Sequence, residues 1–315
     1  MSDAAHEPLE PVHLLPVELC PDGRLAHPQP GLPQPCRPAR QDCAGELVGP
    51  TLFLAPGPIE DAALAEAAKE RNLTIIGHVP RSVPIERILA EGQWRTIEHL
   101  SGYMHPCGGL KIPADEIARY AQLTAESGVW NVPSLVAFAS VPPPEQRATV
   151  AARPEVRYVH PWMHEILQGE YRPFDVICTE STPPRYPTEN LAEMQALVRA
   201  FRDAGAGILL GSDAAAPYVV PGFAIHDELR LLVEAGLTPF EALQAGTFNA
   251  AAALGALDEM GTIAVGKQAD MLLLDADPLE DVRNVQQRSG VMVRGRFFTE
   301  AELQGVLEEL VASYR

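Results

Sequence analysis

The chain has 315 residues, of which 46% are hydrophobic and 21% charged, a composition typical of a globular protein with room for one large domain or two ordinary ones. Its formal charge of -18 repels nucleic-acid phosphates, and no Lys-rich or Arg-rich run offsets that repulsion, so no nucleic-acid partner is expected. No apolar stretch of about 18 residues and no signal-peptide pattern is present, and the five cysteines are scattered; together these features predict a cytoplasmic protein without a membrane partner.

Residues 1–50 differ in composition from the rest of the chain. They hold ten of the thirty prolines and three of the five cysteines. They also show neither helical nor strand periodicity. We expect this segment to be unstructured and unrelated to the remainder of the chain.

From about residue 59 the pattern alternates between helices and short apolar strands, within a predicted domain that spans residues 51–260. The predicted helices span residues 59–71, 85–90, 114–127 and 191–204, and the predicted strands span 73–77, 95–98, 129–132 and 207–211. A repeated order of strand then helix favours parallel strands joined by helical crossovers, and therefore an α/β fold.

The C-terminal part begins with a helix and then changes register. Thr238, Pro239 and Glu241 form a helix-start pattern, which predicts a helix to about Leu254. After Gly261 the residues predict β-strands joined by turns, at 262–265, 269–274 and 290–293. A final helix is predicted over about 300–311.

Two histidines follow two successive predicted strands. His78 follows the strand at 73–77, and His99 follows the strand at 95–98, twenty-one residues later. A single histidine at a strand end is more often structural than functional. Two of them, one strand and helix apart, should be neighbours at the C-terminal edge of a parallel sheet, where barrel enzymes build their sites.

Asp213 follows the strand at 207–211 and adds a carboxylate to the same edge. Alone it would be interpreted as a helix or turn cap. With His78 and His99 it makes a mixed nitrogen and oxygen set suited to zinc or another first-row metal. Asp213 is then both a metal ligand and a candidate general base toward metal-bound water.

Weaker candidates lie elsewhere in the chain. His160 and His164 are four residues apart and lack an evident third ligand, which favours a solvated helix face. His226 lies beyond the last barrel-like strand, where it either faces the site or packs. Tyr103, Tyr218 and His226 are the predicted substrate-binding residues, with Arg230 as a further candidate and a structural role as the alternative for each.

A set of segments gives the chain a family resemblance. They are GHVPRSV, RTIEHLSGY, WNVPSLV, LLGSDAAAPYVVPGF, HDELRLLVEAGLTPFEALQAGTFNAAAALG and GTIAVGKQADMLLLDADPL. Together they resemble the imidazolonepropionase-like and prolidase-like branch of the amidohydrolase superfamily over residues 59–298. The resemblance implies a partial (β/α)8 TIM-like barrel, in which His78 ends the fifth strand, His99 the sixth and Asp213 the eighth. It also implies that residues 261–298 form part of a small β-sandwich. The terminal helix predicted from the sequence pattern falls in the remaining segment, 299–315.

The sequence departs from that family in the metal ligands. Members carry a His-x-His pair on the first barrel strand, and none of His6, His13 and His27 forms such a pair. Many also use a lysine on the fourth strand, but the first lysine here is Lys69, and Thr51–Leu54 occupies about the place of that strand. We therefore expect a truncated chain with about the last four barrel strands and a weakly bound divalent metal, zinc.

The resemblance implies a metal-dependent hydrolase of carbon–nitrogen bonds in amides or cyclic amides. Its expected partners are small substrates, namely dipeptides, N-acyl amino acids or cyclic ureides, and the open edges of a partial sheet predict a homo-oligomer. Because ligands are missing, two alternatives stay open: a non-catalytic remnant, and a small-molecule binding module that has lost the chemistry.

Overall fold

The computed structural model describes most of the chain after residue 50. The described residues are 51–54, 61–80, 83–104, 112–140, 147–164, 190–214, 216 and 218–314. The predicted unstructured segment at 1–50 lies outside them. Within these ranges, no helix combines the length and the apolar character that crossing a bilayer requires.

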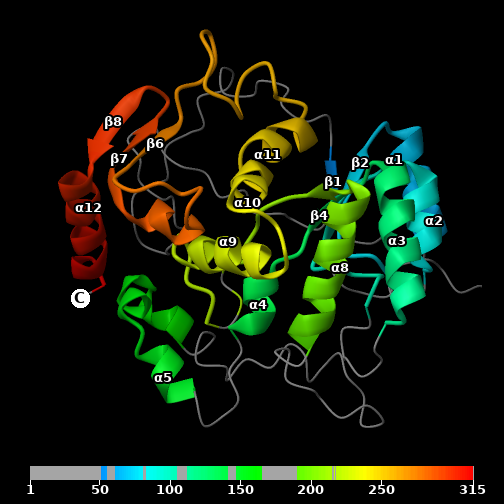
Figure 1. Cartoon of the computed structure of the whole chain (residues 1–315), viewed down its shortest axis with the longest axis horizontal. Coiled ribbons are helices and arrows are strands. Elements are labelled where there is room, and N and C mark those ends of the chain that lie inside the picture. The colour runs from blue at the N-terminus through cyan, green and yellow to red at the C-terminus, as the bar shows by residue number, and fades with distance from the viewer. Residues whose placement is uncertain are drawn as a thin grey trace, which may run out of the picture. The chain divides into compact units, whose positions relative to one another are not determined.

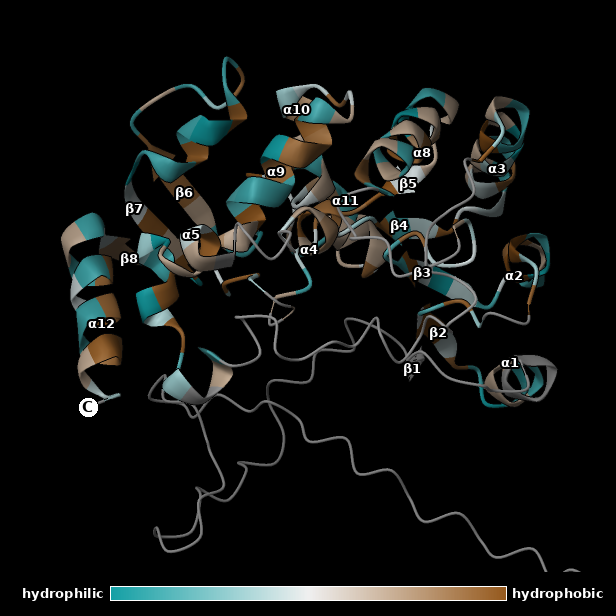
Figure 2. Cartoon of the chain, turned by 90° about the horizontal axis from the view of Figure 1, so that it is seen from below, coloured by the Kyte–Doolittle hydropathy of each residue, from teal (hydrophilic) through white to brown (hydrophobic). Residues whose placement is uncertain are grey.

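Five strands form one parallel sheet (Figure 1), and Figure 2 shows that their order in space follows their order along the chain. They are β1 (Thr51–Leu54), β2 (Thr74–Gly77), β3 (Trp94–Glu98), β4 (Trp130–Val132) and β5 (Gly207–Ile208). Each strand pairs with the next in parallel. This order confirms the predicted partial barrel, and it leaves β1 and β5 as the outer strands of the described sheet.

Four of the helices that connect these strands lie along one side of the sheet (Figure 2). They are α1 (Asp61–Glu70), α2 (Ile85–Glu91), α3 (Ala114–Ser127) and α8 (Leu191–Ala204). The predicted bounds of α3 and α8 are confirmed to the residue. Both end at a glycine in the left-handed conformation, Gly128 and Gly205, because glycine adopts positive φ without steric cost.

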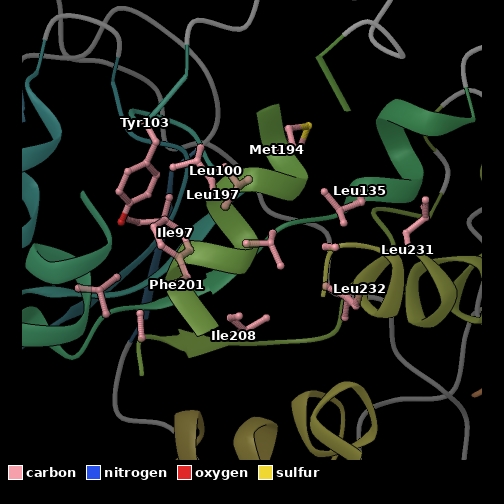
Figure 3. Packing of buried hydrophobic residues seen from close by; sticks show 14 of the residues in the cluster. Ile97, Leu100, Tyr103, Leu135, Met194, Leu197, Phe201, Ile208, Leu231 and Leu232 are labelled. Atoms are coloured by element: carbon pink, nitrogen blue, oxygen red, sulfur yellow. The ribbon is translucent and has the colours of Figure 1, made fainter. Parts of the chain in front are cut away.

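The hydrophobic core fills the space between the sheet and these helices (Figure 3). Leu197 and Phe201 of α8 are fully buried against Ile97 of β3 and Ile208 of β5. The apolar face of α8 therefore rests on side chains from the helix-facing side of the sheet. The opposite side of β3 carries Thr96 and Glu98, because successive strand residues alternate.

The segment after β4 contains helices that the sequence pattern did not reveal. Among the described residues they are α4 (Leu135–Ala139), α5 (Arg147–Ala151) and two 3-10 helices, η2 (Pro154–Tyr158) and η3 (Pro161–Met163). Each is too short to display an apolar periodicity that could be recognised among the surrounding prolines.

The chain after β5 forms α9 (Ala224–Glu234), α10 (Pro239–Ala245) and α11 (Phe248–Ala253). The predicted helix start at Thr238 is confirmed by a capping box with Glu241. The single helix predicted to Leu254 is wrong, because it breaks at Gly246 and Thr247. There the carbonyl of Ala245 accepts a hydrogen bond from the backbone N–H of Leu210 (3.2 Å), so the end of α10 bonds to the chain leaving β5.

A second sheet, antiparallel, contains β6 (Met271–Leu274), β7 (Arg288–Val293) and β8 (Arg296–Thr299), with η5 (Val282–Gln286) between β6 and β7. Helix α12 (Glu300–Ala312) follows and is capped by Thr299 and Glu302. The predicted strand at 262–265 is wrong. Ile263 is 86% exposed and Val265 is fully exposed, and no neighbouring strand pairs with them in the described chain. The proposed domain bounds at 260 and 298 stay predictions.

The pairing of β4 with β5 depends on a glycine. Gly207 lies opposite Trp130, and a Cβ atom at this position would overlap the indole ring. We expect Gly207→Ala to lower the free energy of unfolding by about 1–3 kcal/mol, the usual cost of overpacking. Urea unfolding followed by circular dichroism measures the change.

Gly305 on α12 provides the matched control, since its Cβ would meet nothing within 4 Å. Gly305→Ala should leave stability unchanged or raise it by up to about 1 kcal/mol through helix propensity. Equal stabilities of the two variants would contradict the close approach of Trp130.

Candidate functional site

The two predicted histidines follow neighbouring strands. His78 comes directly after β2, and His99 comes directly after β3. At His99 the backbone turns sharply, with φ of 57° at His99 and 53° at Leu100. The backbone N–H of His99 still donates to the carbonyl of Val132 on β4 (2.8 Å), so the turn begins where the parallel pairing ends.

The loops that carry the two histidines are braced against each other. The backbone N–H of Val79 donates to Oγ of Ser101 (2.9 Å). Gly102, with φ of 85°, passes so close to Val79 that a Cβ atom there would lie 2.8 Å from Cγ1 of that valine. Residues one to three positions beyond the two histidines therefore hold the loops together.

The predicted three residues converge. The imidazole rings of His78 and His99 have centroids 4.9 Å apart, tilted by 38°. Nε2 of His99 lies 3.8 Å from Oδ2 of Asp213. Asp213 lies five residues after the end of β5, which is shorter than the predicted strand, and it adopts φ of 53°. The two imidazoles and the carboxylate meet at the C-terminal edge of the parallel sheet.

Burial shifts the pKa values of His99 and Asp213. It lowers the pKa of His99 to about 4, with a smaller contribution from His78, so His99 is neutral near pH 7. Burial also raises the pKa of Asp213, opposed by the electrostatic attraction of His78. A neutral imidazole has a free lone pair for a cation, and a carboxylate with a raised pKa is a better proton acceptor.

These residues fit a divalent metal in donor chemistry, with two imidazole nitrogens and one carboxylate. In arrangement the fit is incomplete. Within the described residues no three His, Cys, Asp or Glu side chains are grouped so as to hold a metal ion. The buried Nδ1 of His99 also has no hydrogen-bond partner among these residues, whereas metal-binding histidines usually donate their second N–H.

Glu98 belongs to this cluster and was missed by the sequence interpretation. Its carboxylate accepts a hydrogen bond from Oγ1 of Thr96 (2.6 Å) on the same face of β3. Burial raises the pKa of Glu98, Thr96 lowers it, and the negative charge of Asp213 raises it further. The alternation of side chains along β3 could have identified Glu98 from the sequence. A strand that buries Ile97 toward the helices turns Glu98, the next residue, toward the opposite side of the sheet.

Tyr103 is placed in the hydrophobic core rather than beside the histidines. It is 4% exposed, and its hydroxyl shares a hydrogen bond with Oγ1 of Thr124 on α3 (2.8 Å). Its ring packs edge-on against Phe201 of α8 with centroids 5.1 Å apart (Figure 3). Burial raises its pKa to about 12. These contacts account for Tyr103 as a core residue and give no support to a contact with substrate.

The other two predicted substrate-binding residues lie between Asp213 and α9 or on α9 itself. Tyr218 is 4% exposed and has φ of 62°. His226 lies in the first turn of α9; its Nδ1 is buried, and burial and Arg288 lower its pKa. Burial of this kind suits a core residue as well as a pocket wall, so a role toward substrate stays a prediction for both.

The two remaining histidines of the described residues, His160 and His164, have structural contacts. The His160 ring packs edge-on against Tyr314 beyond α12, with centroids 5.0 Å apart. Nε2 of His164 lies 3.2 Å from the carbonyl oxygen of Val159. His160 precedes η3 and His164 follows it, so the two do not share the face of one α-helix. Arg230 pairs with Glu234 on the surface of α9.

Comparisons with known proteins point to one family. The model of the amidohydrolase family matches residues 55–298. Over 112 residues the chain is 36% identical to ochratoxinase from Aspergillus niger, a match that covers 33% of this chain and 22% of that protein. Over 90 residues it is 37% identical to imidazolonepropionase from Parabacteroides distasonis, covering 27% and 20%.

Two solved structures share the fold. A bottromycin amidohydrolase superposes with a TM-score of 0.58 and 23% identity over 83% of this chain and 58% of that one. A Xaa-Pro dipeptidase superposes with a TM-score of 0.50 and 21% identity over 75% and 47%. The matches to the curated relatives thus span about a fifth of their length, and those to the solved structures about half.

The brace between the two histidine loops can be tested at Gly102. Gly102→Ala places a Cβ atom against Val79 in a left-handed backbone, so it combines strain with overlap. Backbone strain by itself lowers the free energy of unfolding, and we expect the overlap with Val79 to lower it by about 1–3 kcal/mol more. Chemical denaturation measures the difference.

Gly92 is the control for strain, because it has φ of 70° and its Cβ would meet nothing within 4 Å. Gly92→Ala should show only the strain. If both variants lose the same stability, Val79 does not pack against Gly102 as described.

Proposed function

Because this chain belongs to the amidohydrolase family, we propose that it hydrolyses carbon–nitrogen bonds in amides or cyclic amides. The observation that supports this most directly is the meeting of His78, His99 and Asp213 at one edge of the parallel sheet. That edge is where barrel enzymes carry their catalytic residues.

The proposed reaction depends on a divalent metal, zinc, with His78, His99 and Asp213 as ligands. When bound, such a cation lowers the pKa of a coordinated water and polarises the substrate carbonyl. The burial that keeps His99 neutral favours this role, because a protonated imidazole cannot bind a cation.

Asp213 is proposed to move the proton. Its raised pKa favours accepting a proton from the attacking water. The same proton then passes to the leaving nitrogen as the carbon–nitrogen bond breaks, so the carboxylate is regenerated. Glu98, at the end of β3, lies near enough that the negative charge of Asp213 raises the pKa of Glu98, so the two carboxyl groups interact electrostatically.

The proposed substrates are small molecules: dipeptides, N-acyl amino acids or cyclic ureides. The names of the similar proteins, imidazolonepropionase and Xaa-Pro dipeptidase, support a small cyclic amide or a dipeptide. Tyr218 and His226 are the proposed contacts for such a substrate.

The outer strands of the parallel sheet, β1 and β5, are the proposed site of homo-oligomer formation.

Metal binding is expected to be weak. The three proposed ligands are not grouped closely enough to enclose a cation, and Nδ1 of His99 lacks a hydrogen-bond partner among the described residues. Zinc-loaded protein dialysed against metal-free buffer should retain clearly less than one zinc per chain by elemental analysis, and Asp213→Asn should retain less still. Tightly held stoichiometric zinc would mean that further ligands exist. The first candidates to test would be His226 and His105, of which His105 lies outside the described residues.

Hydrolysis is tested with the full chain in excess zinc or manganese and a panel of Xaa-Pro dipeptides, N-acyl amino acids and cyclic ureides. We expect turnover of at least one class, and a fall in rate of about 100-fold or more in Asp213→Asn, which removes the proton acceptor. Glu234→Gln, a surface change on α9, is the control and should keep the parent rate.

The absence of turnover on every substrate with metal present would refute the hydrolase proposal. Thermal stabilisation by one of these substrates without turnover would instead identify a small-molecule binding module.

A further inference from the structure

Glu228 is a buried carboxylate that the proposed chemistry does not use. It lies on α9 and is completely inaccessible to solvent. Its two carboxylate oxygens accept hydrogen bonds from the backbone N–H groups of Leu135 (3.0 Å) and Val136 (2.7 Å), more than ninety residues earlier in the chain. Burial raises the pKa of Glu228 to about 8, opposed by the N–H groups of Val136 and Leu135.

These two N–H groups belong to the first turn of α4. The first N–H groups of any helix have no acceptor within the helix, and a side chain at the N-cap position usually supplies one. Here the N-cap residue is Ser134, which has φ of 48° and makes no capping hydrogen bond through its side chain. Glu228 therefore replaces the missing local cap from a distant helix.

Helix α4 carries a side chain that reaches the candidate site. The ring of Phe138 has its centroid 6.4 Å from that of His99, with an angle of 59° between the rings. Nδ1 of His99 lacks a hydrogen-bond partner among the described residues, so the neighbouring rings of Phe138 and His78 contribute to orienting this imidazole, together with the Asp213 carboxylate 3.8 Å from Nε2. A shift of α4 would therefore change the orientation of His99.

We infer that Glu228 is a positioning residue: by holding the first turn of α4, it fixes Phe138 against His99 and so sets the orientation of that imidazole. Its importance for hydrolysis rests on the proposed function, in which His99 is a metal ligand. Helix α4 follows β4, and α9 begins eleven residues after Asp213. The hydrogen bonds of Glu228 therefore connect the segment after β4 with the segment after Asp213.

The test uses the full chain without metal or substrate, labelled on histidine and phenylalanine for NMR. Glu228→Gln keeps the size of the side chain but turns an amide donor toward one of the two N–H groups, so that hydrogen bond is lost. We expect loss of the nuclear Overhauser contact between the Phe138 and His99 rings and a shift of the His99 ring signals. The ring signals of His160, which packs against Tyr314, should stay in place.

Glu234→Gln is the matched control, because it makes the same change on an exposed part of the same helix. It should leave the signals of both histidines unchanged. A folded Glu228→Gln protein that retains the contact between Phe138 and His99 would overturn the inference. A purely structural role would lower the melting temperature without moving the His99 signals selectively.

If the Glu228→Gln variant does not fold, the same NMR experiment is carried out on the Phe138→Leu variant. This variant removes the ring while leaving the Glu228 hydrogen bonds, and unchanged His99 signals would overturn the inference. Because these readouts need neither metal nor turnover, they hold even if no substrate is hydrolysed. Conversely, a Glu228→Gln enzyme that loses activity with unchanged His99 signals would refute the positioning role and leave the proposed function standing.

Discussion

The parallel hydrogen-bond ladder of β2, β3, β4 and β5 is the constraint on which the candidate site depends. Gly77, Ile97, Asn131 and Ile208 are successive partners across this ladder. Strands that run in the same direction and in this register end at the same edge, so the residues that follow them have to meet. His78 and His99 follow such ends directly, and Asp213 reaches them through a short extension of the chain beyond β5.

Contacts outside the ladder then orient the side chains that the ladder brings together. The bond from Val79 to Ser101 and the close passage of Gly102 fix the two histidine loops relative to each other. Glu228 fixes α4, and α4 places Phe138 beside His99. Precision at the cluster thus comes from polar and packing contacts made by residues that carry no proposed chemistry, a common arrangement where ligand orientation matters.

Charge in the cluster is set by burial more than by pairing. Desolvation is the largest cause of the lowered pKa of His99 and of the raised pKa values of Asp213 and Glu98. The result is a neutral imidazole next to carboxylates that accept protons more readily than exposed ones do. Such opposite shifts in one small region are typical of sites that bind cations or transfer protons.

The sequence by itself determined the parallel α/β architecture, the bounds of α3 and α8, and the convergence of His78, His99 and Asp213. It did so because helical periodicity, strand ends and chain order are local properties, and a parallel sheet converts strand ends into neighbours. Only the tertiary structure decided the rest. The break between α10 and α11, the burial of Tyr103 against Thr124, and the capping of α4 by Glu228 all depend on contacts between residues far apart in the chain. The segment 262–265 shows the same dependence on distant residues. A strand is predicted there from the sequence, but a strand needs a neighbour to pair its backbone groups, and the described chain supplies none.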